Sequence, residues 1–151
     1  MRENIALIRN TALAPDAPAT LDDLIAKGKE LKAANKGVTE ILTLPVGQNG
    51  DVYHMMPLMS AGGGSFFAYD AATGKFDPKN LPIASPKTIA AMEKIKAIGE
   101  TAATPVLKRS IGGDNATATF TSGKSAFFIT GPWSVADIKK ANIKYDITAI
   151  P

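Results

Sequence analysis

The sequence predicts an α/β domain in which helices flank a central mixed, mostly parallel sheet. Its 151 residues suit one domain and are enough to bury most of the surface that the unfolded chain exposes. Short β-branched and aliphatic runs alternate with amphipathic segments at helical spacing, an order typical of α/β folds. No unit of about 20 to 50 residues repeats along the chain, which excludes a solenoid or a propeller.

The chain begins with a predicted strand, a loop and a helix. Residues 5–9 are mostly aliphatic and favour a strand, whereas residues 10–19 contain two prolines and favour a loop. Thr20, followed three residues later by Asp23, is typical of a helix N-cap. The helix that follows has apolar residues at helical spacing and is predicted to end at residues 35–37, where a glycine stands.

A second strand and a second helix are predicted next. Residues 38–44 alternate apolar and polar side chains up to a proline, which predicts a strand. Turn-forming residues 46–51 follow it. Residues 52–61 then favour a buried helix that Pro57 would kink and that the glycines at 62–64 end.

The remaining elements are predicted from the same kinds of signal. Residues 66–69 and 75–76 flank a glycine and predict a hairpin, and residues 77–85, with two prolines, predict a loop. Pro86, behind a serine, opens a helix of about four turns whose apolar stripe reaches Ala102. The last four predicted elements are a helix capped by Asp114 and reaching Phe120, a strand at 126–130, a helix at 132–141 and a strand at 145–150.

The charge pattern argues against nucleic-acid binding. The 17 basic and 14 acidic residues give a net charge of +3, and the basic side chains are spread over predicted helix faces instead of forming one patch. No apolar run reaches the roughly 18 residues needed to span a bilayer. The first residues, MRENIALIRN, lack the apolar core and the small-residue cleavage site of a secretory signal.

Residue types that carry catalysis or bind metals are sparse. Cysteine is absent, and His54 is the sole histidine, with only Asp51 at a spacing that could add a second metal ligand. No serine stands in a G-x-S-x-G elbow. The G-K-S sequence at 123–125 resembles the end of a phosphate loop, but Ala118 stands where that motif needs a glycine, and the predicted order is helix to strand. We therefore expect no enzyme activity, no metal and no cofactor.

Two segments combine aromatic and polar side chains where a predicted strand leads into a helix. One carries Asp51, Tyr53 and His54, and the other carries Trp133 after a glycine and a proline; open α/β sheets place ligand clefts at such points. A sugar needs an aromatic surface for its C–H face and carboxylates or amides for its hydroxyls, so Tyr53 and Trp133 are candidates for the surface and Asp51 for the acceptor. The alternative is that Trp133 is a core residue and Tyr53 a half-buried one. For His54 we expect a hydrogen-bonded, partly buried residue, and the alternative is that it contacts the ligand.

Five segments, spread in order along nearly the whole chain, resemble parts of one known family. The sequence I-T-G-P-W at 129–133 and the sequence I-T-A-I-P at 147–151 resemble the strand, loop, helix and strand that close one lobe of the maltose- and maltodextrin-binding proteins. Residues 3–24 resemble the segment in which that family's chain enters its second lobe. Residues 118–127 resemble the family's A-F-x-x-G-x-x-A pattern, and residues 50–63 resemble its ligand loop and helix.

The resemblance implies a single lobe of a periplasmic-binding-protein type II fold. Residues 1–151 would form the central, second-lobe segment of a two-lobe sugar receptor, without the first lobe and without the C-terminal helices of the second. Asp51, Tyr53 and Trp133 would contact the sugar. The implied partners are an oligosaccharide, the other lobe and, for the intact receptor, an ABC permease. The parent receptor would lie outside the cytoplasm, either in the periplasm or lipid-anchored at the cell surface.

Two interpretations of the function remain open on the sequence. The first is a non-enzymatic lobe that binds maltodextrin-like oligosaccharides weakly when alone, with dissociation constants of roughly millimolar or worse, because such receptors bury their ligand between two lobes. The second is a structural lobe that binds no ligand independently. In either case, the missing helices would leave an apolar surface through which we expect the fragment to self-associate.

Overall fold

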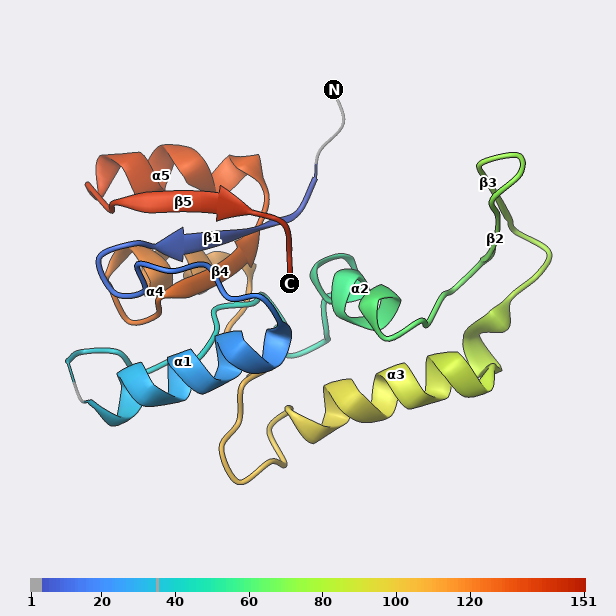
Figure 1. The fold of residues 1–151 in the computed structure, drawn as a ribbon, viewed down its shortest axis with the longest axis horizontal. Coiled ribbons are helices and arrows are strands. Elements are labelled where there is room, and N and C mark those ends of the chain that lie inside the picture. The colour runs from blue at the N-terminus through green and yellow to red at the C-terminus, as the bar shows by residue number, and fades with distance from the viewer. Residues whose placement is uncertain (1–3, 35) are drawn as a thin grey trace. The chain divides into compact units, whose positions relative to one another are not determined.

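A computed structural model of the protein describes residues 4–34 and 36–151 (Figure 1). Glu3, which belongs to the expected lobe-entry segment, and Asn35, which belongs to the expected end of the first helix, lie outside the described residues. The chain divides into two compact units, one built from two separate stretches and the other from a single stretch. These units are Met1–His54 together with Val106–Pro151, and Met55–Pro105.

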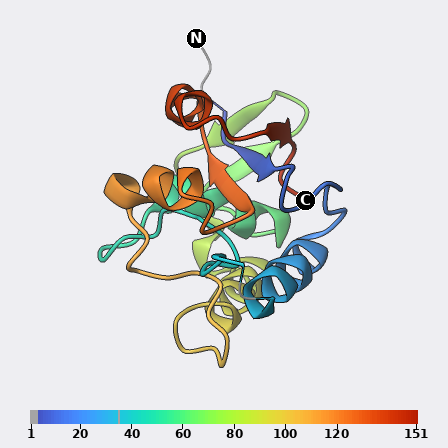
Figure 2. The same ribbon diagram turned by 90° about the vertical axis from the view of Figure 1, so that its left-hand side faces the viewer.

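The first unit contains a three-stranded sheet with strand order β4-β1-β5 (Figures 1 and 2). Strand β1 (Ala6–Asn10) lies between β4 (Phe127–Thr130) and β5 (Tyr145–Thr148) and is antiparallel to both. In the middle of the sheet, Ile8 pairs with Phe128 in β4 on one side and with β5 on the other. The mostly parallel sheet predicted from the sequence is therefore wrong for these strands.

The strand order explains this difference. Strands β4 and β5 are both antiparallel to β1, so they run parallel to each other, as expected for two strands joined through a helix. The strand from the start of the chain occupies the place between them and makes both pairings antiparallel. An aliphatic run such as β1 predicts a strand, but it does not tell which distant strands will lie beside it.

Residues 38–44 form one bridge to β4 instead of the predicted strand. Thr43 pairs with Phe128 in the parallel direction. Farther back, the two consecutive N–H groups of residues 39–40 both donate to the carbonyl of Lys124. A parallel ladder spaces its hydrogen bonds evenly along both strands, so two donors on one carbonyl interrupt it. The segment nevertheless stays buried along most of its length.

Helix α1 (Leu21–Ala33) begins at the predicted cap. The Thr20 Oγ1 accepts a hydrogen bond from the Asp23 N–H at 3.1 Å, and Asp23 Oδ2 accepts one from the Thr20 N–H at 3.1 Å. The pair is a complete capping box, which satisfies two backbone donors at the helix start. On the buried face, a Cβ at Gly28 would lie 2.5 Å from the carbonyl oxygen of Ile41, so the helix packs closely against the segment that leads to Thr43.

Helices α4 (Gly113–Thr121) and α5 (Val135–Lys140) pack on each other and against the sheet. The cap of α4 is Gly112 and not the predicted Asp114, which lies in the first turn. The Gly112 N–H donates to Asn115 Oδ1 at 3.0 Å. Acidic residues are favoured both at the cap and in the first turn, so the sequence alone did not separate these places. One core joins these elements and consists of Ile8, Ile111, Ala116, Phe120, Phe128 and Ile138.

The second unit contains most of α2, a two-stranded hairpin and α3 (Figure 1). The predicted hairpin is present and is antiparallel, with a glycine of positive φ in its turn. The predicted loop before α3 contains one short 3-10 helix, η1. The bounds are α2 Val52–Ala61, β2 Ala68–Asp70, β3 Lys75–Asp77, η1 Pro82–Ala84 and α3 Pro86–Ala97.

Helix α3 has the predicted start and a shorter end. Ser85 Oγ accepts a hydrogen bond from the Thr88 N–H at 3.2 Å, which confirms the predicted cap. The helix stops before Ala102, because the N–H groups of Ile98 and Gly99 bond to carbonyls three residues back and so tighten the last turn. In neither unit do the described residues include a helix long and apolar enough to cross a membrane.

Candidate functional site

Asp51 stands just before α2 and caps its first turn. Its Oδ1 accepts a hydrogen bond from the His54 backbone N–H at 3.0 Å, and its Oδ2 lies 2.7 Å from His54 Nδ1. An ionised carboxylate can only accept hydrogen bonds, so Nδ1 carries the imidazole proton and donates it to Oδ2. The side chain of His54 is 11% exposed and that of Asp51 is 31% exposed. The prediction that His54 is hydrogen-bonded and partly buried is therefore confirmed.

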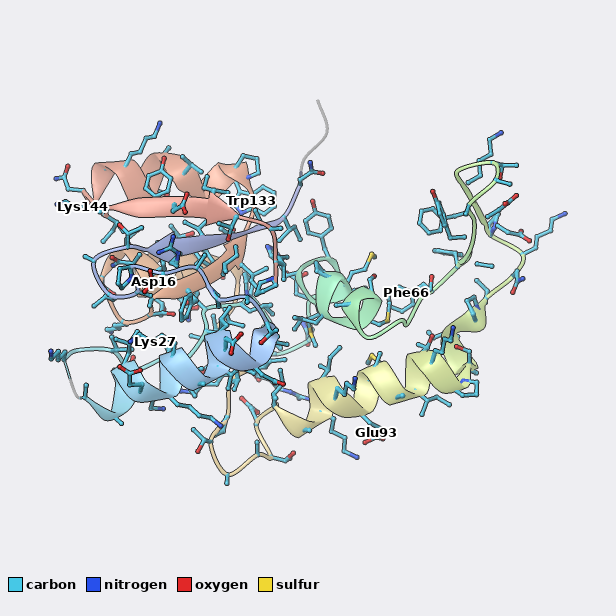
Figure 3. The ribbon with its side chains drawn as sticks, viewed as in Figure 1. Asp16, Lys27, Phe66, Glu93, Trp133 and Lys144 are labelled. Atoms are coloured by element: carbon cyan, nitrogen blue, oxygen red, sulfur yellow. The ribbon has the colours of Figure 1, made fainter. Side chains whose placement is uncertain are left out.

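A short 3-10 helix, η2 (Pro132–Ser134), follows β4 and carries Trp133, which is labelled in Figure 3. A Cβ at Gly131 would lie 2.2 Å from two ring atoms of Trp133. The indole therefore lies directly against the backbone of Gly131, in space that any other side chain would fill. The G-P-W sequence thus positions its tryptophan through the absence of a side chain two residues earlier.

Two hydroxyl contacts fix the η2 turn from its buried side. Ser134 Oγ lies 3.0 Å from Thr130 Oγ1 at the end of β4 and 3.2 Å from Thr117 Oγ1 in α4. Thr130 and Ser134 are both buried. Hydrogen bonds between buried, satisfied polar groups favour one arrangement of the chain around them. The turn that carries Trp133 is therefore attached to both the sheet and α4.

Three aromatic rings meet where α2 starts and η2 turns. The Tyr53 and Trp133 ring centroids are 6.2 Å apart with an angle of 41° between the ring planes. His54 lies 5.5 Å from Tyr53 and 5.8 Å from Trp133, at 89° to each. Tyr53 is 47% exposed and Trp133 is 45% exposed. The alternative that Trp133 is a core residue is therefore wrong.

The structure brings the three residues singled out from the sequence, Asp51, Tyr53 and Trp133, into one cluster through His54. The cluster offers two partly exposed ring surfaces beside a partly exposed carboxylate. Two hydrogen bonds to His54 leave further acceptor positions on the two Asp51 oxygens. Such a surface can stack on an apolar face of a ligand and accept hydrogen bonds from its edge.

A sequence model of the bacterial extracellular solute-binding proteins matches residues 2–151 of this chain. The chain belongs to this family. Its candidate site therefore lies in a solute-binding protein.

Two relatives of this solute-binding protein come from Streptococcus pneumoniae, and both bear the name maltooligosaccharide ABC transporter solute-binding lipoprotein. The protein of strain R6 is 28% identical over 149 residues, which are 99% of this chain and 34% of the relative. The protein of the serotype 4 strain TIGR4 is 27% identical over 149 residues, which are again 99% of this chain and 34% of the relative. This solute-binding protein thus spans about a third of the length of these curated relatives.

Sequence reasoning missed the buried hydroxyl contacts and the close ring contacts that hold the site in place. Nothing in the spacing of Thr117, Thr130 and Ser134 shows that their hydroxyls meet, because the contact depends on how α4 lies against β4. The sequence indicated the role of Gly131 only weakly. A glycine just before a proline and an aromatic residue suggests that the ring lies close to the backbone. The contact between His54 and Trp133 had no signal in the solute-binding protein's sequence.

Proposed function

We propose that this chain binds a maltose- or maltodextrin-like oligosaccharide at Asp51, Tyr53 and Trp133 and carries out no chemical step on it. The observation that carries the proposal is the pair of half-exposed rings, 6.2 Å apart, next to a carboxylate. A sugar ring presents C–H groups on its faces and hydroxyls around its edge, and this surface offers complementary groups for both. The names of the two relatives support the same ligand class.

The angle between the two rings favours a curved sugar chain. Tyr53 and Trp133 are inclined to each other by 41°. Two consecutive sugar rings that stack on them are therefore also inclined to each other. An α(1→4)-linked chain of glucose units curves in this way, whereas a β(1→4)-linked chain is nearly flat. Maltotriose is therefore the ligand for testing, and cellotriose is its matched comparison.

The arrangement around Asp51 suits binding better than hydrolysis. Glycoside hydrolysis uses two carboxyl groups about 5 to 9.5 Å apart on either side of the bond that breaks. The contacts described for Tyr53, His54 and Trp133 include one carboxylate, that of Asp51. Both of its oxygens are engaged by His54. Asp51 is thereby suited to accept hydrogen bonds from hydroxyls in a fixed orientation.

We propose that residues 1–151 form one lobe of an extracytoplasmic, two-lobe sugar receptor that delivers its ligand to an ABC permease. The family and the relatives' names support this assignment. A receptor of this kind closes two lobes around its sugar, so one lobe supplies only part of the contacts. We therefore expect the chain alone to bind maltotriose with a dissociation constant of about 1 mM or weaker.

The test is a maltotriose titration of the chain by protein NMR and by fluorescence of Trp133, the sole tryptophan. We expect shifts at Tyr53 and Trp133 and a change in emission that saturates in the millimolar range. Trp133→Ala should weaken binding by about five- to thirtyfold, because it removes a stacked aromatic surface worth about 1 to 2 kcal/mol. Cellotriose should bind more weakly than maltotriose.

Tyr69→Ala is the matched control, because Tyr69 is also an exposed aromatic residue, at 57%, and lies on the hairpin of the other unit. It should leave the maltotriose titration unchanged. A folded chain that responds to no sugar would instead identify a lobe without independent ligand binding.

Tyr69, together with Phe76 at 63% exposure, also marks an apolar surface through which such a lobe would self-associate. Light scattering of the parent and of Tyr69→Ala measures that association.

A further inference from the structure

The imidazole of His54 contacts both the carboxylate and the two other aromatic rings of the candidate site. Its Nδ1 is hydrogen-bonded to the Asp51 carboxylate at 2.7 Å. Its ring stands perpendicular to both Tyr53 and Trp133, with centroid distances of 5.5 and 5.8 Å. One side chain therefore contacts the proposed hydroxyl acceptor and both proposed stacking surfaces.

The second ring nitrogen of His54, Nε2, is buried and has no hydrogen-bond partner among the described residues. With the proton on Nδ1, Nε2 is an acceptor that receives no hydrogen bond. Buried polar atoms are nearly always paired, so an unpaired one in a folded protein needs an explanation. The orientation of the imidazole therefore depends on the Nδ1 bond to Asp51 and on the contacts of its ring with Tyr53 and Trp133.

Protonation changes what His54 offers to each neighbour. It turns Nε2 into an N–H donor and places a positive charge beside two aromatic rings, whose faces attract cations. Among the described residues, the titratable groups that contact the imidazole are Asp51 and Tyr53, and the facing turn Pro132–Ser134 contains none. The charge of His54 therefore acts on the Asp51 carboxylate and on the Trp133 ring at the same time.

We propose that His54 is a positioning residue that holds the Asp51 carboxylate and the Trp133 indole in one arrangement, and that this arrangement follows the protonation of its imidazole. The contact between His54 and Trp133 needs no ligand, whereas its effect on sugar affinity rests on the proposed function. Maltotriose affinity then differs between about pH 5.5 and about pH 8, the range in which histidine side chains change charge.

The chain carries a specific probe for this coupling, because His54 is its only histidine and Trp133 its only tryptophan. Trp133 emission is measured without sugar from about pH 5 to about pH 8, and NMR of the imidazole protons follows His54 over the same range. We expect emission to fall toward acid pH together with the NMR transition, since an imidazolium in contact with an indole quenches its fluorescence. Emission that stays constant while His54 titrates overturns the coupling.

Two substitutions separate the ring of His54 from its hydrogen bond. His54→Phe keeps a ring beside Tyr53 and Trp133 but removes the bond to Asp51. His54→Asn keeps an N–H donor near the position of Nδ1 but removes the ring. Both should lose the pH response of Trp133 emission, and circular dichroism establishes that each variant is folded. A pH response that persists in His54→Phe assigns it to another group and overturns the proposal.

Maltotriose titrations at the two pH values separate this proposal from the proposed function. The parent should bind with a pH-dependent affinity, and His54→Asn should bind about two- to tenfold more weakly, the fold-change for loss of one aromatic pair, without pH dependence. Equal affinity of parent and variant at both pH values overturns the positioning role and leaves the sugar site standing. Emission that responds to pH in a chain that binds no sugar overturns the proposed function and supports the coupling.

Discussion

Gly131 and Asp51 each combine a backbone role with the placement of a side chain. Gly131 follows β4 at the start of η2 and leaves the space in which the Trp133 indole lies. Asp51 caps α2 and also holds the imidazole of His54. Each substitution at these two positions therefore changes local backbone structure and the candidate site together. Variants at the rings alone are cleaner tests of binding for that reason.

Gly131→Ala should displace the Trp133 indole. The added Cβ would lie 2.2 Å from the ring, so we expect the free energy of unfolding to fall by about 1 to 3 kcal/mol through overpacking. The emission maximum of Trp133 should move to longer wavelength as the ring leaves the backbone for water. Gly113→Ala is the control, because no atom lies within 4 Å of its added Cβ and it starts α4. Equal stability of the two variants in urea would contradict the close packing at Gly131.

Single helices and turns of this chain were predictable because their signals are local. The cap at Thr20 with Asp23 and the cap at Ser85 each depend on residues within one turn of the helix. The pairing of β1 depends instead on strands more than a hundred residues away, and no run of aliphatic residues encodes that choice. The candidate site was predictable as residue types, but its arrangement depends on the non-local contact between α2 and η2.

The β2–β3 hairpin carries a carboxyl group that reports on its turn. The Thr73 hydroxyl, 2.8 Å from Asp70 Oδ2, and then the Ala72 N–H hold the pKa of the Asp70 carboxyl below its ordinary value. A pKa lowered by folding stabilises the turn above the ordinary pKa of the carboxyl, and that stabilisation is lost as the pH falls through the lowered pKa.

Thr73→Val should therefore raise the pKa of Asp70 toward its ordinary value, because it removes the hydroxyl that stabilises the charged carboxylate. NMR of the side-chain carboxyl carbon, followed from neutral to acid pH, measures it. Thr73→Ser keeps the hydroxyl and should keep the low pKa. A pKa of Asp70 that is the same in the valine and serine variants would show that the hydroxyl is not the cause.

The two units of the molecule differ in how much they bury. In the first unit, β1 from the start of the chain pairs with β4 and β5 from its last part. This unit fully buries the side chains of Phe120, Phe127 and Phe128. Fewer apolar residues are buried in the second unit, as far as the structure describes it. They are Leu58, Met59, Ala91 and Ile95. Regions with fewer buried apolar contacts open at lower free energy than the core of a protein.

Amide hydrogen exchange should therefore separate the two units. We expect the backbone amides of α3 in the second unit to exchange faster than those of β1 and β4, by about tenfold for each 1.4 kcal/mol of difference in opening free energy. Exchange followed by NMR in the native state measures both sets in one experiment. Maltotriose should slow exchange at the start of α2 and around η2, where the proposed ligand contacts lie. Equal protection of α3 and β1 would mean that the chain opens as one cooperative unit, because both would then report the same global unfolding.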